Sequence, residues 1–285
     1  MSDNPYVAFL PEVRRAAASA PPEESWWSWE GHRVHIARAR RPESPLRLLL
    51  IHGAGGHSGA LWPLAALLAD RGLEAAAVDL PLYGRTISPR PEQVRYDHWV
   101  QLLCDLVAAE HDGRPLVVLG ASIGGLLGLE VAARTSGVAA VVATCLIDPA
   151  SLRTQAHLTR FGPLGVLAGP LSLLARGRLA ATMVPMRWMA ALGRMSRDTK
   201  LSRLCAVDPL GGGSAGPARL PGFLAAVPAH PAEPDHRPGG AAPPSRGRLD
   251  PGGAQRADAT SAGRPQPRGD AARLRSLPRR GAGAG

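Results

Sequence analysis

Between residues 46 and 147, short apolar runs alternate with segments in which apolar positions recur at helical spacing. The apolar runs are almost free of charge, as strands buried on both faces of a sheet must be. The predicted strands are 46–51, 74–79, 115–120 and 138–147, and the predicted helices are 59–71, 92–111 and 122–134. Strands that alternate with helices of this length predict an α/β fold, with a mostly parallel sheet and helices on both faces.

Two shorter strand-like runs precede this region, at 26–29 and 33–37. They flank Gly31, and a glycine between two such runs is typical of a β-hairpin. We therefore place the start of an α/β core at residue 25, after a polar lead-in over residues 1–24.

The pattern changes twice after residue 150. Residues 151–215 are rich in Leu, Met and Arg but are interrupted by Gly and Pro, which predicts a helical cap that follows the core of residues 25–150. In residues 216–285, Gly, Pro, Ala and Arg fill 50 of 70 positions. A segment with so little apolar material cannot offset the entropy lost on ordering, so we expect this tail to be disordered.

The densest chemical signal lies at residues 120–124, which read Gly-Ala-Ser-Ile-Gly. This G-x-S-x-G pattern directly follows a predicted strand and directly precedes a predicted helix, as a nucleophile elbow requires. The glycines leave room for the neighbouring strand and helix, and the strained turn exposes the Ser122 hydroxyl. The N–H of Ile123, at the helix N-terminus, can then stabilise a developing oxyanion. The alternative is that Ser122 is a structural turn serine.

The same pattern recurs around Ser214, at residues 212–216. No predicted strand precedes this second copy and no predicted helix follows it. The context therefore favours Ser122 as the nucleophile.

A glycine-rich loop, His-Gly-Ala-Gly-Gly at residues 52–56, follows the predicted strand 46–51. The backbone at Gly53 and Ala54 is suitably placed to supply the second hydrogen-bond donor of an oxyanion hole, and we choose the Ala54 N–H as this donor. We interpret His52 as an orienting residue rather than a base. The alternative is that the loop is only a tight turn.

Three segments, 50–53, 79–86 and 120–125, resemble successive landmarks of the α/β-hydrolase family in order and spacing. The resemblance covers roughly residues 25–215 and places the cap where that family inserts its lid. It implies a serine hydrolase that acts on an ester, thioester or amide without a metal or an organic cofactor. Ser122 would attack the substrate, and Ala54 and Ile123 would hold the oxyanion.

The sequence does not show the usual setting of the other catalytic residues. A serine nucleophile needs a histidine to take its proton and an acid to orient that histidine. The family's acid usually follows a strand after the lid, and its histidine often lies in a Gly-x-His setting. His230 and His236 lie between prolines and are interpreted as solvated coil. Asp148 ends the strand after the one that bears Ser122, so it is the candidate acid, with a structural cap as the alternative.

The four residues that dominate the tail are those encoded by codons made only of G and C. We hypothesise that a frameshift near residues 216–230 replaces the final strands, the acid and the base. The sheet of the chain as written would then expose an unpaired edge. The alternative is a genuine low-complexity tail whose arginines could bind polyanions. Nucleic-acid binding is disfavoured because aromatic residues for base stacking are not interleaved.

Charge, cysteine content and the longest apolar stretch exclude several classes of protein and site. The formal net charge is +10, and residues 216–285 carry +6 of it. Three cysteines, without CxxC spacing, argue against a disulfide framework and a zinc site. The N-terminus lacks a signal-peptide pattern, and the longest apolar stretch, 161–175, is too short to span a bilayer. We therefore expect a cytoplasmic protein with no metal and no membrane span.

The predicted cap favours a lipophilic substrate weakly. Its apolar segments and its four methionines could adapt to acyl chains, although ordinary packing against the sheet would use the same residues: Met183, Met186, Met189 and Met195. The sequence thus predicts a serine hydrolase that cleaves a small-molecule carboxylic ester through an acyl-enzyme. The alternative is an inactive or truncated homologue that lacks its catalytic histidine and at most binds a ligand or a partner.

Overall fold

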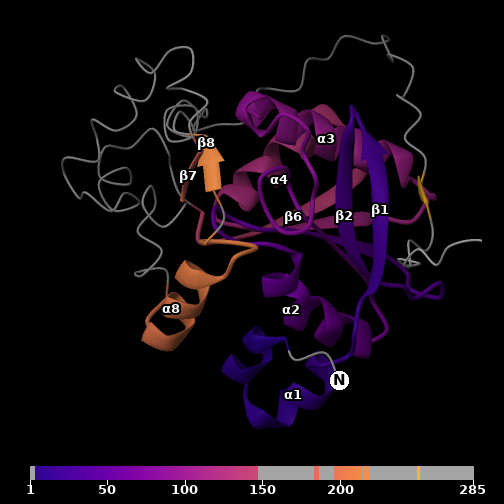
Figure 1. The fold of residues 1–285 in the computed structure, drawn as a ribbon. Helices are drawn as coiled ribbons and strands as arrows, with labels where there is room; N and C mark the ends of the chain where they lie inside the picture. The colour runs from indigo at the N-terminus through magenta and orange to yellow at the C-terminus, as the bar shows by residue number, and fades with distance from the viewer. Residues whose placement is uncertain (1–3, 147–182, 186–195, 214, 218–248, 251–285) are drawn as a thin grey trace, which may run out of the picture. The chain divides into compact units, whose positions relative to one another are not determined.

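The computed structural model describes residues 4–146, 183–185, 196–213, 215–217 and 249–250. The chain divides into two units, residues 1–253 and 254–285, and all described residues belong to the first. Its elements, drawn in Figure 1, are η1 Pro5–Phe9, α1 Glu12–Ala18, β1 Glu23–Trp29, β2 His32–Ala39, β3 Arg47–Ile51, α2 Ser58–Asp70, β4 Glu74–Val78, η2 Pro91–Gln93, α3 Tyr96–Ala109, β5 Leu116–Ala121, α4 Ile123–Arg134, β6 Val138–Thr144, β7 Met183–Pro185, α8 Thr199–Val207, β8 Ala215–Pro217 and β9 Leu249–Asp250.

The central sheet has the strand order β6-β5-β3-β4-β2-β1-β9. Strands β4, β3, β5 and β6 are parallel, whereas β2 is antiparallel to both β4 and β1. The hairpin β1–β2 turns through Glu30 and Gly31, both with positive φ, as a two-residue turn of this kind requires. The predicted mostly parallel α/β architecture is confirmed.

Strand β3 is buried on both faces and separates two apolar cores. Leu48 and Leu50 pack with Trp62 of α2 on one face. Leu49 and Ile51 belong to the core formed with α3 and α4 on the other face. Figure 1 shows α2 on one side of the sheet and α3 and α4 on the other. The continuous apolar run in the sequence therefore reflects a strand covered by helices on both sides.

The lead-in contains structure that the apolar pattern did not predict. Helix α1 packs against α2, and the Trp62 indole N–H donates a hydrogen bond to the Ala20 carbonyl at 2.6 Å. Strand β1 also begins at Glu23, three residues before the predicted run.

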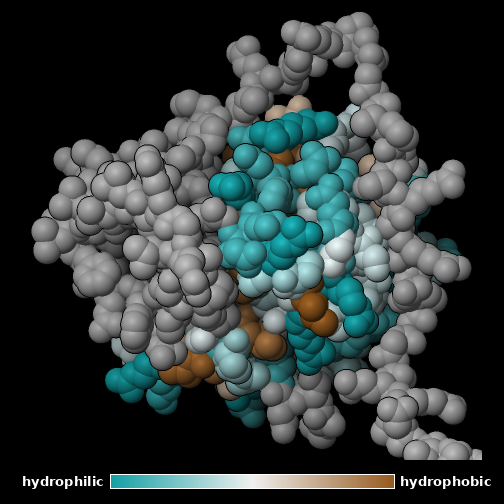
Figure 2. All heavy atoms as spheres, turned by 45° about the horizontal axis from the view of Figure 1, so that its top comes forward, coloured by the Kyte–Doolittle hydropathy of each residue, from teal (hydrophilic) through white to brown (hydrophobic). Residues whose placement is uncertain are grey.

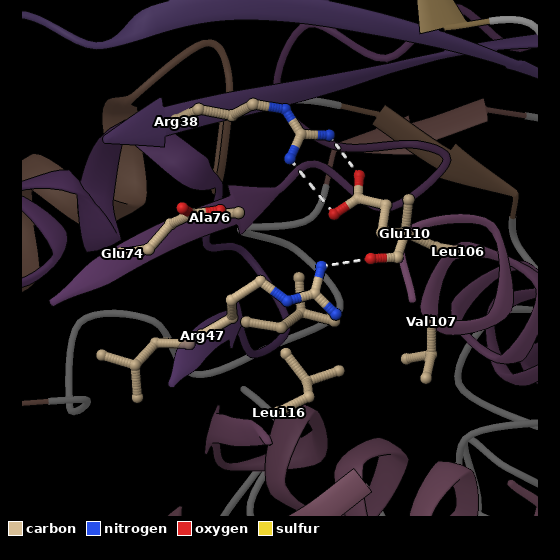
Figure 3. A pocket seen from close by; sticks show the side chains of 10 residues that line it. Arg38, Arg47, Glu74, Ala76, Leu106, Val107, Glu110 and Leu116 are labelled. Carbon is tan, nitrogen blue, oxygen red and sulfur yellow. Dashed lines mark hydrogen bonds and ion pairs between the residues drawn. The ribbon is translucent and has the colours of Figure 1, made fainter. Parts of the chain in front are cut away.

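Charged side chains gather at the amino ends of the parallel strands, away from the carboxyl ends where Ser122 lies. Arg38 forms an ion pair with Glu110 through two hydrogen bonds, and Arg47 donates to the Glu110 carbonyl. Figure 3 shows both guanidinium groups pointing toward Glu110. The Glu110 carboxylate neutralises Arg38, and Arg47 is neutralised by an ion pair with Asp112 at 3.2 Å; both arginines are almost fully buried.

Most of the predicted cap and tail falls outside the described residues. In 151–215, the described parts are β7, residues 196–213 with α8, and Ala215; in 216–285, they are 216–217 and 249–250.

On the face shown in Figure 2, the described surface is largely hydrophilic, with several small apolar areas rather than one broad apolar patch.

Candidate active site

Ser122 stands at the turn between β5 and α4 with backbone angles φ 55° and ψ −119°. A positive φ is uncommon for a residue with a side chain and costs of order 1–3 kcal/mol. Neighbouring structure holds the turn, because the Ser122 N–H donates to the Thr144 carbonyl of β6 at 2.9 Å. Ile123 is the first residue of α4, so its N–H has no partner within the helix.

Both glycines of the motif are required by close packing. A Cβ at Gly120 would lie 2.2 Å from the Gly124 carbonyl oxygen. A Cβ at Gly124 would lie 2.3 Å from the Ile51 carbonyl oxygen at the end of β3. The strand, the elbow and the helix can therefore approach this closely only with glycine at both positions.

The glycine-rich loop lies directly beside the serine. A Cβ at Gly53 would lie 3.2 Å from the Ser122 Cβ and 2.9 Å from the Ala121 carbonyl oxygen. Ala54 follows and is partly buried against the larger core. The structure thus brings Gly53, Ala54, Ser122 and Ile123 to one edge of the sheet.

His52 has both ring nitrogens engaged. The Leu80 N–H donates to His52 Nε2 at 3.1 Å, and Nδ1 is 2.8 Å from the Gly53 carbonyl oxygen, to which it donates. Burial lowers the pKa of His52 to about 4, so the ring is neutral near pH 7. A neutral ring with two internal partners is suited to orienting the loop and not to receiving a proton from Ser122.

Asp79, after β4, is a second organising residue near the loop. Its carboxylate accepts hydrogen bonds from the Ser58 and Arg85 N–H groups and from His35 Nδ1 at 2.7 Å. Gly84, at φ +59°, packs on this carboxylate, with an added Cβ about 2.0 Å from Asp79 Cγ. Burial alone would raise the pKa of Asp79, but His35 and the two N–H groups lower it, so the carboxylate is ionised.

Sequence reasoning did not assign two further residues near the loop, His57 and Asp208. His57 Nε2 lies 2.9 Å from Asp208 Oδ2, although 151 residues separate them. The available signals were a second histidine just after the glycine-rich loop and an Asp-Pro before a glycine run, and neither specifies a contact. Asp148, His230 and His236 lie outside the described residues, as does Ser214.

Comparisons with known proteins show the family and the fold of this chain. A sequence model of the family described as serine aminopeptidase, S33, a hydrolase family, matches residues 43–227, well over half of the chain. The chain belongs to this family. Its match to the serine aminopeptidase family includes the loop at 52–56 and the elbow at 120–124. A search of curated protein sequences found no match.

Solved structures share the fold at low sequence identity. A soluble variant of monoglyceride lipase from Saccharomyces cerevisiae is 18% identical, with 74% of this chain and 70% of that chain covered and a TM-score of 0.59. A monoacylglycerol lipase from Paleococcus ferrophilus is 21% identical, with 67% and 68% covered and a TM-score of 0.52. DcsB, solved with its substrate analogue, is 14% identical, with 71% and 72% covered and a TM-score of 0.55. The α/β-hydrolase fold of this family member is therefore shown.

The described residues lack two kinds of feature. They contain no helix long and apolar enough to cross a membrane. Nor do they contain a group of three or more His, Cys, Asp or Glu side chains that could hold a metal ion.

Proposed function

We propose that this protein is a serine hydrolase that cleaves a carboxylic ester, with Ser122 as the nucleophile. The observation that carries the proposal is the strained Ser122 backbone, fixed between two glycines and directly beside the Gly53 loop. Such strain persists only where the surrounding structure enforces it, and it is typical of functional positions. Membership of the serine aminopeptidase family supports the same chemistry.

In this proposal Ser122 Oγ bonds to the ester carbonyl carbon, and the N–H groups of Ala54 and Ile123 stabilise the negative charge on the carbonyl oxygen. A base takes the Ser122 proton and gives it to the departing alcohol. Water then attacks the acyl-enzyme, releases the acid and restores Ser122. Asp148 remains the proposed acid partner of the base, and His52 remains the proposed orienting residue of the loop.

The proposed substrate is a lipophilic small-molecule ester. The methionines and apolar segments of residues 151–215 support this choice from the sequence. Two of the structural neighbours are a monoglyceride lipase and a monoacylglycerol lipase, whose fold this chain shares. We propose no metal and no organic cofactor for the reaction, because nucleophilic catalysis by serine needs neither.

Labelling by a fluorophosphonate tests the proposal, because the probe bonds to an activated serine with loss of fluoride. The full chain should be labelled, and Ser122→Ala should abolish the label. Ser214→Ala is the matched control, since it removes the serine of the other G-x-S-x-G copy. Labelling that persists in Ser122→Ala, or that is lost only in Ser214→Ala, would contradict the assignment.

A second candidate is an inactive homologue that lacks its catalytic histidine. It is favoured by one observation: the family match ends at residue 227, within the segment where the composition changes to Gly, Pro, Ala and Arg. We propose that a change of reading frame near residues 216–230 produced this tail. Sequencing the gene across codons 205–240 tests it. Another frame that encodes two apolar strands and a Gly-x-His would support the frameshift, and its absence would refute it.

A further inference from the structure

Asp208, the residue after α8, joins three segments that are far apart in the sequence. Its Oδ2 accepts a hydrogen bond from the Tyr6 hydroxyl at 2.7 Å and another from His57 Nε2 at 2.9 Å. Its Oδ1 accepts the Leu210 N–H at 2.9 Å. The residue is only 8% exposed. A nearly buried carboxylate with three donors is well satisfied, and losing it would leave the His57 Nε2–H group without this partner.

His57 is held in one tautomer by its two neighbours. Nδ1 accepts the Gly59 N–H at 3.1 Å, where His57 caps the N-terminus of α2. Nε2 therefore carries the proton that is donated to Asp208. The Tyr6 ring packs edge-on against the imidazole at 5.8 Å between centroids. Since His57 is the residue that follows the glycine-rich loop, fixing its ring fixes the end of that loop.

The backbone after Asp208 also touches the loop directly. A Cβ at Gly211 would lie 2.3 Å from the Gly55 carbonyl oxygen and 3.4 Å from His57 Cδ2. The neighbouring Leu210 carbonyl accepts the Gly84 N–H at 2.8 Å, which ties the same segment to the turn after β4. Residues 208–211 thus lie against the loop at Gly55 and against His57.

The loop needs such support. Three of its residues are glycines, Gly53, Gly55 and Gly56, and Gly55 has φ 75°. Glycines lose the most backbone entropy on ordering, so a loop rich in them keeps one shape only when its surroundings impose it. Gly53 touches the elbow on one side, and His57 is fixed by Asp208 on the other.

We propose that Asp208 is a positioning residue that acts through His57 to hold residues 53–57 in the shape of an oxyanion loop. The residue does not touch the reacting atoms. This inference rests on the proposed function, because it assigns a purpose to the loop beside Ser122. A role confined to anchoring α8 would leave the loop unaffected, which makes the two roles distinguishable.

The test compares Asp208→Asn with Asp198→Asn in the full chain. Asp198 caps the N-terminus of the same helix with an exposed carboxylate, so it matches the chemical change without touching the loop. The first measurement is steady-state hydrolysis of p-nitrophenyl butyrate. Asp208→Asn should lower kcat about 10- to 100-fold, as expected for a misplaced oxyanion donor, with little change in KM. The control should keep the wild-type kcat.

The second measurement is amide hydrogen exchange of the peptide that covers residues 52–58. Exchange should become faster in Asp208→Asn and stay unchanged in Asp198→Asn, while exchange in β3 is the same in both. Unchanged exchange in the loop would overturn the proposal. So would a loss of kcat that is equal in the two variants, because it would reflect α8 alone.

The two proposals fail in different ways. If the wild-type chain neither hydrolyses the ester nor accepts the fluorophosphonate, the proposed function is refuted, and hydrogen exchange alone decides the role of Asp208. If the wild type is active and the Asp208→Asn loop is as protected as in the wild type, the proposed function stands and the positioning role is refuted.

Discussion

At the scale of single residues, the strained turn at Ser122 requires glycine at positions 120 and 124, because neighbouring backbone atoms leave no space for a Cβ there. Gly124 is the clearest case, because the space a Cβ would need is occupied by the Ile51 carbonyl. Gly124→Ala should lower the free energy of unfolding by about 2 kcal/mol or more, since the strand and helix must move apart. Urea denaturation measures this free energy of unfolding. Gly72→Asn is the control, because nothing lies within 4 Å of a Cβ there and Asn tolerates its φ of +81°. Equal stability of Gly124→Ala and the wild type would contradict the packing argument.

His35 provides a pH-dependent prediction. The imidazole of His35 lies between the carboxylates of Asp79 and Glu24. Arg85 forms an ion pair with Glu24, and the Trp26 ring packs edge-on against the imidazole. Burial alone would lower the pKa of His35, but the two carboxylates outweigh it and raise the pKa. A raised pKa stabilises the fold fully below the unfolded value of about 6.5, and this stabilisation is lost as pH rises through the folded value.

His35→Gln should therefore be more destabilising at pH 6 than at pH 9. Urea denaturation of both proteins at the two pH values gives the comparison. His111→Gln, at an exposed position, is the control and should show no such trend. A loss of stability that is the same at both pH values would show that the charge on His35 contributes nothing.

The sequence predicts individual residues well where local chemistry fixes them. The pattern Gly-Ala-Ser-Ile-Gly predicts the strained turn at Ser122, because that turn leaves space only for glycine at positions 120 and 124. It does not identify His57 and Asp208 as partners, since the two residues are 151 positions apart and no local pattern specifies a contact over that separation. The roles of all the predicted site residues remain predictions: Ser122, Asp148, Gly53, Ala54, Ile123 and His52.

At the scale of helices and strands, the charged cluster around Glu110 should make a measurable contribution to stability. Glu110 directly follows α3 and binds Arg38 from β2, so it ties the helix to the sheet (Figure 3). Glu110→Gln should lower the free energy of unfolding by about 3 kcal/mol, because it leaves a buried guanidinium without its counter-charge. Thermal and urea unfolding measure the change, and the exposed Glu43→Gln substitution should change little. A Glu110→Gln protein as stable as the wild type would mean that the ion pair only offsets its own desolvation.

Helices and strands could be predicted where their apolar residues are buried within the sheet or against it. Strand β3 is apolar from Leu48 to Ile51 because helices cover both of its faces. Helix α1 was not predicted because it is short and is stabilised by packing on α2, with only Ala18 fully buried within it. The two-residue turn at Glu30 and Gly31 makes β2 antiparallel to β1, in agreement with the hairpin predicted around Gly31.

At the scale of the whole molecule, strand β6 stands at one end of the sheet in the described strand order. Its Val142 is 48% exposed, and Leu146, just beyond it, is 53% exposed. An apolar edge strand is a template for pairing with another chain. The chain as written should therefore self-associate as its concentration rises, as measured by size-exclusion chromatography with light scattering. Val142→Lys should reduce the association, and a monodisperse wild-type monomer at every concentration would contradict the prediction.

The central claim is that the turn between β5 and α4 presents an activated serine. Intact-mass spectrometry of the full chain after incubation with a fluorophosphonate, followed by peptide mapping, tests it most directly. One adduct per chain is expected, carried by the peptide that contains Ser122. A chain that folds cooperatively and gains no adduct, or that carries it on any other residue, would contradict the claim.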